Sequence, residues 1–473
     1  MKVKILLAAT TFLVSTVLVG HAQDGPQQIL FTNASVFDGF SPDLIEGANV
    51  LVEGNVITQA STDKIDAPSA KVIDATGKYL TPGLIDMHTH SMFYTPEGSN
   101  SYQDEWDAPA GGAMAAQGLR DDALMKGITT VREIAGNSRG LARAAQRGLL
   151  VGPRIYTSGA VLSHTGGHGD WGDRNDLEVS DYGAQVQHSM IVNNRDDVIE
   201  ASRRNYRNGA HFTKIMAGGG VASRFDPLEI LGATQEEMEA AVEIATDYGT
   251  YVAIHAYHDK SYQRAIDAGV RSFEHGFLVS EDIVKQLAAK GEEIVWSFQC
   301  YMSVNSFGSY ESMPEFFTHE QKLKGVAVGK GARNAAKMML EHNVFMTGGA
   351  DMFGQGLQEI RKQDITCKVN DVGYPAAHVW KMHTGNAGKV LKWSGPLDPY
   401  PTYALGTIAP DSYADILLWD ENPVEDINVI LDESKLHLIM KDGLTYKNIM
   451  VDPSDPSYLQ ASTSNTRFYT PLQ

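Results

Sequence analysis

Short apolar runs separated by turn signals occupy both ends of the chain. In the N-terminal stretch, Gly54 and Asn55 stand between two alternating apolar segments, a context that predicts a β-hairpin. A similar texture of short apolar runs and turns returns near the C-terminus. We therefore predict that residues 23–80 and 400–450 together form one small β-sandwich domain.

Between these ends, candidate buried strands alternate with amphipathic helical patterns, for example in residues 235–249 and 280–291. The strand candidates cover residues 83–90, 127–135, 154–162, 211–219, 251–257, 271–279, 293–301 and 344–352. Eight strands, each followed by a helix or a long loop, predict an α/β fold, a (β/α)8 TIM-type barrel over residues 81–399. A doubly wound parallel sheet is the alternative, but it usually has fewer strands.

Length and composition agree with this architecture and limit the partners. The 473 residues are 43% hydrophobic and 21% charged, which predicts a large buried core. The formal net charge is −19, and no run of Lys or Arg occurs. Because phosphate groups would be repelled, a nucleic-acid or anionic-membrane partner is excluded, whereas assembly into a homo-oligomer stays open.

The two termini carry segments outside these domains. Residues 1–22 contain two early lysines, an apolar run over 5–19 and small residues before Gln23, the pattern of a secretory signal peptide. We expect removal of this peptide near Ala22 and export to the periplasm. The run is too short to span a bilayer, so no stable membrane anchor is expected. Residues 451–473 are predicted to form an extended tail.

Cysteine usage excludes a thiolate metal cluster and a disulfide framework. Cys300 and Cys367 are the only cysteines in the chain. In an oxidising compartment the two could form one disulfide. The sequence alone leaves open whether they meet.

Polar side chains recur where the predicted barrel strands end. His88 and His90 stand at positions i and i+2 of the first strand, so both imidazoles point to one side and can bind one metal ion. The later strand ends carry Lys214, His255, His275 and Asp351. Catalytic residues of a TIM-type barrel lie at these C-terminal ends. Their nitrogen and oxygen donors favour Zn²⁺, with Mn²⁺, Co²⁺ or Fe²⁺ as substitutes.

Lys214 needs separate consideration, because a charged ammonium beside a metal ion would be repelled. Burial lowers the pKa of a lysine, and its neutral amine can take up CO₂ to form a carbamate. A carbamate is an anionic oxygen donor that can bridge two ions. Lys214 is alternatively a salt-bridge partner at the mouth of the barrel.

Residues 81–90 read TPGLIDMHTH, which resembles the PGxIDxHxH signature of the amidohydrolase superfamily. The later segments FTKIMAGGG, AIHAY, FEHG and TGGAD resemble further strand ends of that family in the same order. The resemblance extends from about Ile29 to Asn448. The lysine after strand four and the HAY of strand five are similar to the imidazolonepropionase-related, prolidase-like branch, which includes metal-dependent dipeptidases and ochratoxin-type amide hydrolases.

This resemblance implies a binuclear metal centre. It places His88, His90 and Asp351 on one ion and His255 and His275 on the other. A carboxylated Lys214 would lie between the two ions, which are expected to be Zn²⁺.

These groups suit hydrolysis of an amide. Two cations that share a water lower its pKa, and one of them polarises the scissile carbonyl. Asp351 is expected to take the proton of that water and to pass it to the departing nitrogen, because an amine anion is a very poor leaving group. We predict a small-molecule or dipeptide substrate, cleaved at the amide before a C-terminal amino acid, as in prolidase-like dipeptidases and N-acyl amino acid hydrolases.

Two further residues are candidates for substrate binding. His168 follows the third predicted strand in a Gly-rich segment, and Tyr257 stands two residues after a predicted metal ligand, so either could anchor a substrate carboxylate. Arg224 belongs to the run MAGGGVASRFDP, where prolidase-like relatives have a short turn, and its role stays open. Since no Lys followed by Ser or Thr comes after these glycines, a phosphate loop is not predicted.

Three other functions remain to be weighed. An amidohydrolase could act on a cyclic amide, a lactone or a carbamate. Residues 136–140 match GxSxG between a strand and a helix, which makes Ser138 the nucleophile of an alternative serine hydrolase. A non-catalytic periplasmic binding protein is the last alternative. The serine hydrolase leaves the His, Lys and Asp set unexplained. Loss of one ligand would favour the binding protein, but no ligand of the set is missing.

Overall fold

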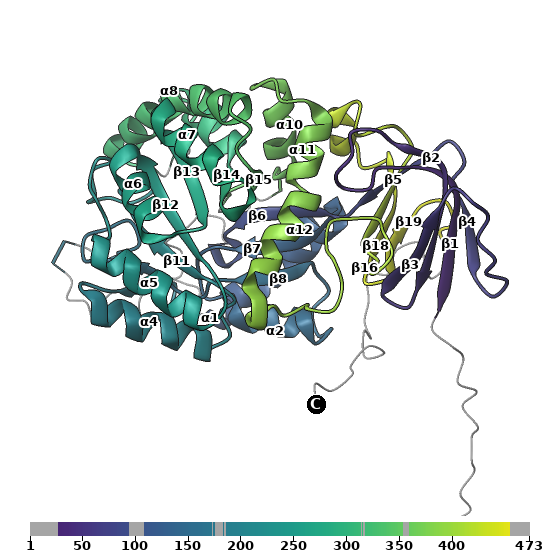
Figure 1. Ribbon diagram of the computed structural model, residues 1–473, viewed down its shortest axis with the longest axis horizontal. Coiled ribbons are helices and arrows are strands. Elements are labelled where there is room, and N and C mark those ends of the chain that lie inside the picture. The colour runs from purple at the N-terminus through teal and green to yellow at the C-terminus, as the bar shows by residue number, and fades with distance from the viewer. Residues whose placement is uncertain are drawn as a thin grey trace, which may run out of the picture.

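The computed structural model describes residues 27–93, 108–172, 174–175, 183, 186–313, 315, 317–352 and 359–454. Figure 1 shows an α/β part that carries the long helices and, beside it, a β-rich part in which purple strands from the beginning of the chain lie next to yellow strands from its end. The two ends of the chain therefore meet, as their similar sequence texture predicts. The leader, and most of the predicted tail, fall outside the described residues.

One sheet of the β-rich part combines nine strands of the described residues in the order β16-β3-β2-β1-β5-β17-β18-β19, with β4 paired to β1. Its strands are β1 Gln28–Val36, β2 Ile45–Glu53, β3 Val56–Ser61, β4 Lys71–Asp74, β5 Tyr79–Pro82, β16 Ser412–Tyr413, β17 Ile416–Trp419, β18 Leu436–Lys441 and β19 Leu444–Asn448. The predicted hairpin at Gly54 and Asn55 is confirmed, because β2 and β3 pair antiparallel across it. The sandwich form of this domain and its boundaries at residues 80 and 400 stay predictions.

The α/β part holds two parallel sheets in the described chain, ordered β6-β7-β8 and β10-β9-β11-β12-β13-β14-β15. Their strands are β6 Leu84–Thr89, β7 Ile128–Glu133, β8 Arg154–Thr157, β9 Val161–Ser163, β10 Ser189–Ile191, β11 Thr213–Met216, β12 Val252–His258, β13 Ser272–Leu278, β14 Val295–Phe298 and β15 Met346–Gly348. Parallel strands with intervening helices fit the predicted TIM-type barrel, while its complete closure stays a prediction.

The third predicted strand is divided in the structure. Residues 154–162 supply both β8 and β9, which belong to different sheets. Gly159 between them has a φ of +67°, a left-handed conformation that turns the chain out of the strand direction. The short strand β10 was not among the predicted strands.

Helices follow the strands and cover the sheets. The longer ones are α1 Ala108–Gly118, α2 Arg139–Gln146, α4 Arg195–Arg207, α5 Gln235–Asp247, α6 Asp259–Ala268, α7 Glu281–Ala289, α8 His319–Glu341, α10 Lys362–Asn370, α11 Ala376–Met382 and α12 Gly385–Leu391. Helices α5 and α7 confirm the two helical patterns identified in the sequence. Thr234 and Glu237 form a capping box that starts α5. Among the described helices, none has both the length and the apolar character needed to cross a membrane.

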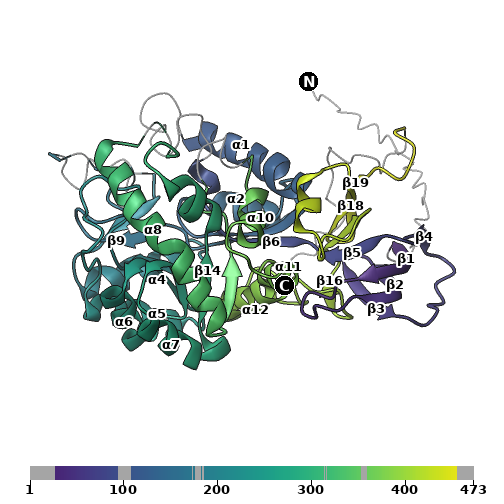
Figure 2. The same cartoon turned by 90° about the horizontal axis from the view of Figure 1, so that it is seen from above.

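A very short link carries the chain from the β-rich part into the α/β part. β5 ends at Pro82 and β6 begins at Leu84, and Figure 2 shows β6 leading away from the β-rich part. Gly83 between them has no room for a side chain, because a Cβ would lie 2.1 Å from the Thr129 Oγ1. β6, the strand that carries His88, is thereby held tightly against β7.

A buried charge cluster joins the two parts on another side. The guanidinium of Arg154, on β8, is fully buried and pairs with Asp415 and Asp442 of the β-rich part. It also lies over the ring of Tyr413, 4.4 Å from the ring centroid. A buried arginine needs such partners because an unpaired charge in the interior is very costly.

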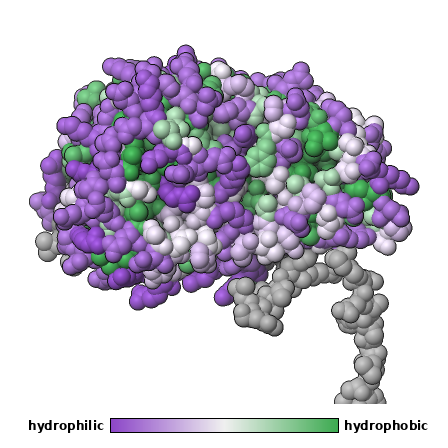
Figure 3. All heavy atoms as spheres, viewed as in Figure 1, coloured by the Kyte–Doolittle hydropathy of each residue, from purple (hydrophilic) through white to green (hydrophobic). Residues whose placement is uncertain are grey.

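The outer helix faces are polar, and the apolar faces point inward. In Figure 3 hydrophilic side chains cover most of the visible α/β part, while apolar groups surface more often over the β-rich part. The largest buried apolar cluster lies between the parallel strands and the helices, and includes Trp296, Phe298 and Trp380. Burial of this cluster is the main contribution to the stability of the scaffold.

The two cysteines form a disulfide. Cys300 follows β14 and Cys367 lies in α10, and their Cα atoms are 5.9 Å apart. The sequence left this pairing open. The bridge links the segment after β14 to α10, across a sequence separation of 67.

Candidate functional site

One cavity lies toward the C-terminal ends of the parallel strands. All eight predicted site residues line it, and they are His88, His90, His168, Lys214, His255, Tyr257, His275 and Asp351. They come from β6, β11, β12 and β13 and from the segments that follow β6, β9 and β15. The structure thus brings together all eight side chains predicted for the metal centre and the substrate. The chemical role of each side chain is a separate question.

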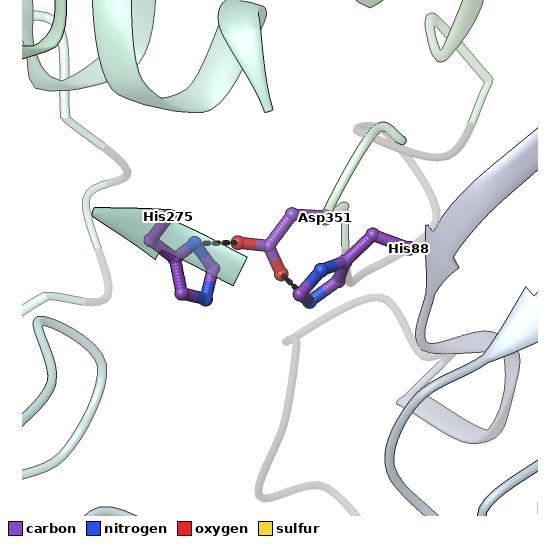
Figure 4. Close-up of side chains that lie close together, drawn as sticks. All are labelled: His88, His275 and Asp351. Carbon is purple, nitrogen blue, oxygen red and sulfur yellow. Dashed lines mark ion pairs between the residues drawn. The ribbon is translucent and has the colours of Figure 1, made fainter. Parts of the chain in front are cut away.

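Three of these residues form the closest group of donors. The ligating atoms of His88, His275 and Asp351 all lie within 4.8 Å of one another, and Figure 4 shows both imidazoles directed at the carboxylate. The Asp351 Oδ1 lies 3.2 Å from the His88 Nε2 and 3.0 Å from the His90 Nε2, and Oδ2 lies 3.8 Å from the His275 Nδ1. The Asp351 backbone N–H donates to the His88 carbonyl at 2.8 Å, which connects the chain after β15 to β6.

Two of these residues adopt an unusual backbone conformation. His275 has a φ of +68° and Asp351 a φ of +53°, in the left-handed region that non-glycine residues rarely occupy. Such conformations cost on the order of 1–3 kcal/mol and persist only where the surroundings enforce them. At His275 the bend has a direct consequence, because the consecutive side chains of Glu274 and His275 both approach His88.

The proton on His88 can be assigned from its neighbours. Its Nδ1 lies 2.8 Å from the Glu274 Oε2, and a carboxylate oxygen only accepts, so Nδ1 donates. In the neutral ring, Nε2 then presents a lone pair to the Asp351 Oδ1. Two facing lone pairs repel unless a cation or a proton lies between them. Burial disfavours a charged His88, but Asp351 and Glu274 outweigh it and raise the pKa of His88.

The donor set therefore fits a divalent cation. Burial would raise the pKa of Asp351, but the imidazoles of His88 and His90 hold it well below its usual range. Burial lowers the pKa of His255 and of His275 well below the usual range, so both rings are neutral and can bind a metal. Neutral imidazoles beside an ionised carboxylate are the ligands that zinc prefers in open sites.

His255 belongs to a second group of side chains on the other side of His275. Its Nε2 donates to the Gly219 carbonyl at 3.1 Å, which leaves the Nδ1 lone pair free to bind a metal. Its ring centroid lies 4.5 Å from that of His275, and its ring stacks on His168 at 4.1 Å. The carbonyl of Gly219 thus orients a predicted ligand.

The glycine run after β11 allows this close packing. A Cβ on Gly220 would lie 1.9 Å from the His168 Nδ1, and a Cβ on Gly219 would lie 1.9 Å from the Pro227 carbonyl oxygen. The glycines therefore bring the backbone up to two histidines. Arg224, further along this run, lines a neighbouring outer pocket together with Trp171 and Phe317.

Lys214 is only 2% exposed, on β11. Within the residues that the structure describes, its ammonium makes neither a hydrogen bond nor an ion pair. Burial lowers the pKa of Lys214 to about 8, with a smaller opposing effect of Glu274. A neutral amine is therefore accessible near neutral pH, which is the form that can react with CO₂.

The two predicted substrate contacts differ in what they offer. The Ser223 hydroxyl donates to the Gly220 carbonyl, so its oxygen accepts a bond of 2.8 Å from the His168 Nδ1. Burial lowers the pKa of His168 to about 4, so the ring is neutral and its Nε2 is an acceptor. Burial raises the pKa of Tyr257 well above its usual range, so its hydroxyl stays protonated and can donate.

Several residues of the site were not identified from the sequence. Glu274, whose Oε2 lies 2.8 Å from the His88 Nδ1, stands directly before a predicted ligand in FEHG, and that position is its only signal in the sequence. The apolar walls were also missed, and include Phe93, Trp171, Met302, Phe307 and Phe317. These come mainly from loops and short turns and follow no periodic pattern.

The serine-hydrolase alternative finds no support in the geometry. Ser138 is fully buried and does not line the cavity, and its hydroxyl lies 2.7 Å from that of Thr157. A nucleophilic serine needs a histidine within hydrogen-bond reach and access to substrate. Ser138 instead precedes α2 as part of the turn after β7.

Comparison with known proteins agrees with the fold. A curated relative, ochratoxinase of Aspergillus niger, is 28% identical over 392 residues, which are 79% of this chain and 77% of the relative. Among solved structures, a prolidase in complex with N-methylphosphonate-L-proline is 29% identical with a TM-score of 0.78, over 89% of this chain and all of that one. A Xaa-Pro dipeptidase with bound methionine is 27% identical with a TM-score of 0.74 over the same shares.

The family assignment rests on a longer match. The model of the amidohydrolase family matches residues 79–445, which include β5 and every predicted ligand. Together with the family match, these relatives support a hydrolase that acts on amide bonds. The chain belongs to the amidohydrolase family, in the branch of the prolidase-like enzymes and ochratoxinase.

Proposed function

We propose that this protein is a secreted, periplasmic, binuclear metal-dependent amidohydrolase that cleaves the amide bond before a C-terminal amino acid. The observation that carries this proposal is the convergence of four imidazoles, a carboxylate and a buried lysine in one cavity. His88, His90 and Asp351 would hold one ion and His255 and His275 the other, with the carbamate of Lys214 between them. Two divalent ions, mostly Zn²⁺, lower the pKa of a shared water and polarise the scissile carbonyl when bound.

Asp351 is proposed as the proton shuttle. Its Oδ1 lies 3.2 Å from the His88 Nε2 and 3.0 Å from the His90 Nε2, whereas Oδ2 lies 3.8 Å from the His275 Nδ1. Oδ2 is therefore the less engaged oxygen and can take a proton from the attacking water. The same oxygen then delivers this proton to the departing amide nitrogen, which must leave as a neutral amine.

Tyr257 and His168 are proposed to bind the two polar ends of the product amino acid. The Tyr257 hydroxyl is a donor and suits the free carboxylate. The His168 Nε2 is an acceptor and suits an N–H of the scissile amide. The apolar wall formed by Phe93, Phe307 and Phe317 would pack against the apolar group on the other side of the bond.

Purified protein is expected to contain close to two metal ions per chain, mostly zinc, because the ligands divide into two groups that share only one lysine. Elemental analysis measures this directly, and prolonged chelation should abolish hydrolysis. One bound ion with full activity would contradict the binuclear centre. Activity that survives chelation but is lost with a serine-directed phosphonate would instead indicate Ser138.

The substrate class is tested with a panel of dipeptides and N-acyl amino acids and with their carboxyl-amidated forms. Amidation should lower kcat/KM by at least about tenfold, since it removes a charge-assisted hydrogen bond worth about 1.5 kcal/mol or more. Tyr257→Phe should reduce activity on the free acid more than on the amide. Tyr206→Phe is the matched control, because its buried hydroxyl contacts the Thr213 Oγ1 and does not line the cavity.

The same assay contains the outcomes that would disprove this substrate class. Equal rates on acid and amide would show that no carboxylate is bound. A clear preference for lactones, carbamates or cyclic amides would indicate the alternative amidohydrolase chemistry.

A further inference from the structure

A buried charged pair lies directly behind His88. The guanidinium of Arg132, on β7, donates from Nη2 to the Glu274 Oε1 at 2.6 Å and from Nε to the Met87 carbonyl at 2.6 Å. Its Nη1 donates to the Ser272 Oγ at 2.9 Å. Arg132 and Glu274 are both 0% exposed. One arginine thus ties together β6, β7 and β13, the strands that carry His88 and His275.

The two oxygens of Glu274 face different partners. Oε1 accepts from Arg132 and, at 2.9 Å, from the Ser272 hydroxyl. Oε2 accepts from the His88 Nδ1 at 2.8 Å and from the Gln299 Nε2 at 3.3 Å. If this carboxylate only neutralised Arg132, contact through Oε1 would be enough. The second oxygen is instead directed at the ring of a predicted metal ligand.

Gln299 offers the only competing hydrogen bond among the described neighbours of His88 Nδ1, at 3.2 Å. If its amide donated to Nδ1, that nitrogen would carry a lone pair, and the ring proton would move to Nε2. The Glu274 Oε2 would then face a lone pair at 2.8 Å without a proton between them. Because this arrangement is repulsive, Glu274 selects the form of His88 whose lone pair is on Nε2.

We infer that Glu274, held by Arg132, is a positioning residue that fixes the tautomer and ring orientation of His88 for metal binding. This inference rests on the proposed metal-dependent function. A carboxylate that accepts the second proton of a ligating imidazole makes the other nitrogen a stronger donor, and loss of such a partner typically weakens metal binding 10–100-fold. Arg132 holds the carboxylate in place through Oε1 and contacts the carboxylate rather than the His88 ring.

Glu274→Gln is the first test. The glutamine amide cannot accept hydrogen bonds from both Arg132 and His88. In one orientation its NH₂ group faces the donors of Arg132, and in the other its NH₂ group faces the His88 Nδ1 and forces the ring proton onto Nε2. The apparent dissociation constant for Zn²⁺, measured with a competing chelator in the absence of substrate, should rise about 10–100-fold. The visible absorption of the Co²⁺-loaded protein should change as well, since it reports the ligand field of the ion.

A double variant separates this role from a structural one and covers the case in which Glu274→Gln does not fold. Arg132→Met with Glu274→Leu removes both buried charges together, a replacement that is often neutral for stability. The double variant should fold, as measured by its melting temperature, and still bind Zn²⁺ about tenfold or more weakly. Glu237→Gln is the matched control with unchanged affinity, because Gln also serves in the capping box of α5.

Three results would overturn the inference. Folded Glu274→Gln with a dissociation constant within about twofold of the wild type would show that the tautomer is fixed without Glu274. A double variant with wild-type affinity would assign the pair a structural role only. A wild-type chain that binds no metal would disprove the proposed function together with this inference. The first two results, by contrast, would overturn only the inference.

Discussion

Asp351→Asn is expected to lower kcat by about 100-fold or more on the best substrate of the panel. Asparagine keeps the shape of the side chain but can neither take up nor deliver a proton, and general acid–base catalysis typically contributes 10²–10⁴-fold. The backbone conformation favours this choice of variant, because Asn tolerates the left-handed φ of +53° that Asp351 adopts, whereas a bulkier residue would add strain. Steady-state kinetics with parallel metal analysis measures the effect.

Asp411→Asn is the matched control for this variant. Asp411 has a similar φ of +63°, but it is exposed in the turn before β16, outside the cavity. The control should therefore keep wild-type kcat and metal content. Wild-type turnover in Asp351→Asn with both ions bound would exclude Asp351 as the shuttle. If the variant instead loses metal and regains wild-type turnover once both ions are restored, Asp351 is a ligand only.

The grouping of the predicted ligands in one cavity could be predicted because each of them lies on a parallel strand or just after one. In such a sheet the carboxyl ends of all strands meet at one edge, so residues as distant in sequence as His88 and Asp351 become neighbours. The HxH spacing on β6 adds the same-side rule for positions i and i+2. The topology of the sheet therefore allows a site in space to be predicted from the positions of polar residues along the sequence.

The role of Glu274 could not be predicted from the same rule. Alternation along a regular strand would direct the side chains of Glu274 and His275 to opposite sides. The left-handed φ at His275 interrupts this alternation, so both side chains approach His88. The division of the third strand at Gly159 is a similar case, since a positive φ at one residue changes which sheet the chain joins. The apolar walls arise from loops whose positions depend on tertiary packing. No local pattern specifies any of these three features.

Lys214→Ala is expected to lose a metal ion and to lower kcat/KM on the order of 10²-fold or more. Lys214 is the one member of the set that both groups of ligands would share, and an ion in such a site stabilises transition-state charge by several kcal/mol. Short carboxylic acids added with metal should partly restore activity, because they can supply the two oxygens of the missing carbamate. Elemental analysis and kinetics at increasing acetate concentration measure both effects.

Lys214→Arg tests the carbamate itself. A guanidinium keeps its proton and cannot take up CO₂, so this variant should remain inactive although it keeps the positive charge and much of the volume. Lys362→Arg is the matched control. Lys362 is also buried, with a pKa that burial lowers to about 8, but its ammonium donates to the Ile430 carbonyl, a contact that arginine can also make.

A direct observation of the carbamate completes this test. Metal-free protein given ¹³C-labelled bicarbonate and Zn²⁺ should show a carbamate carbon signal in the wild type and in Lys362→Arg, and none in Lys214→Arg. Reactivation of the metal-free wild type should be faster with bicarbonate than without it. If Lys214→Arg stays active, or if the signal is absent from a fully active wild type, the bridge is not a carbamate. The buried ammonium of Lys214 would then need a substrate carboxylate as its partner, since its own pKa of about 8 leaves it largely charged below that pH.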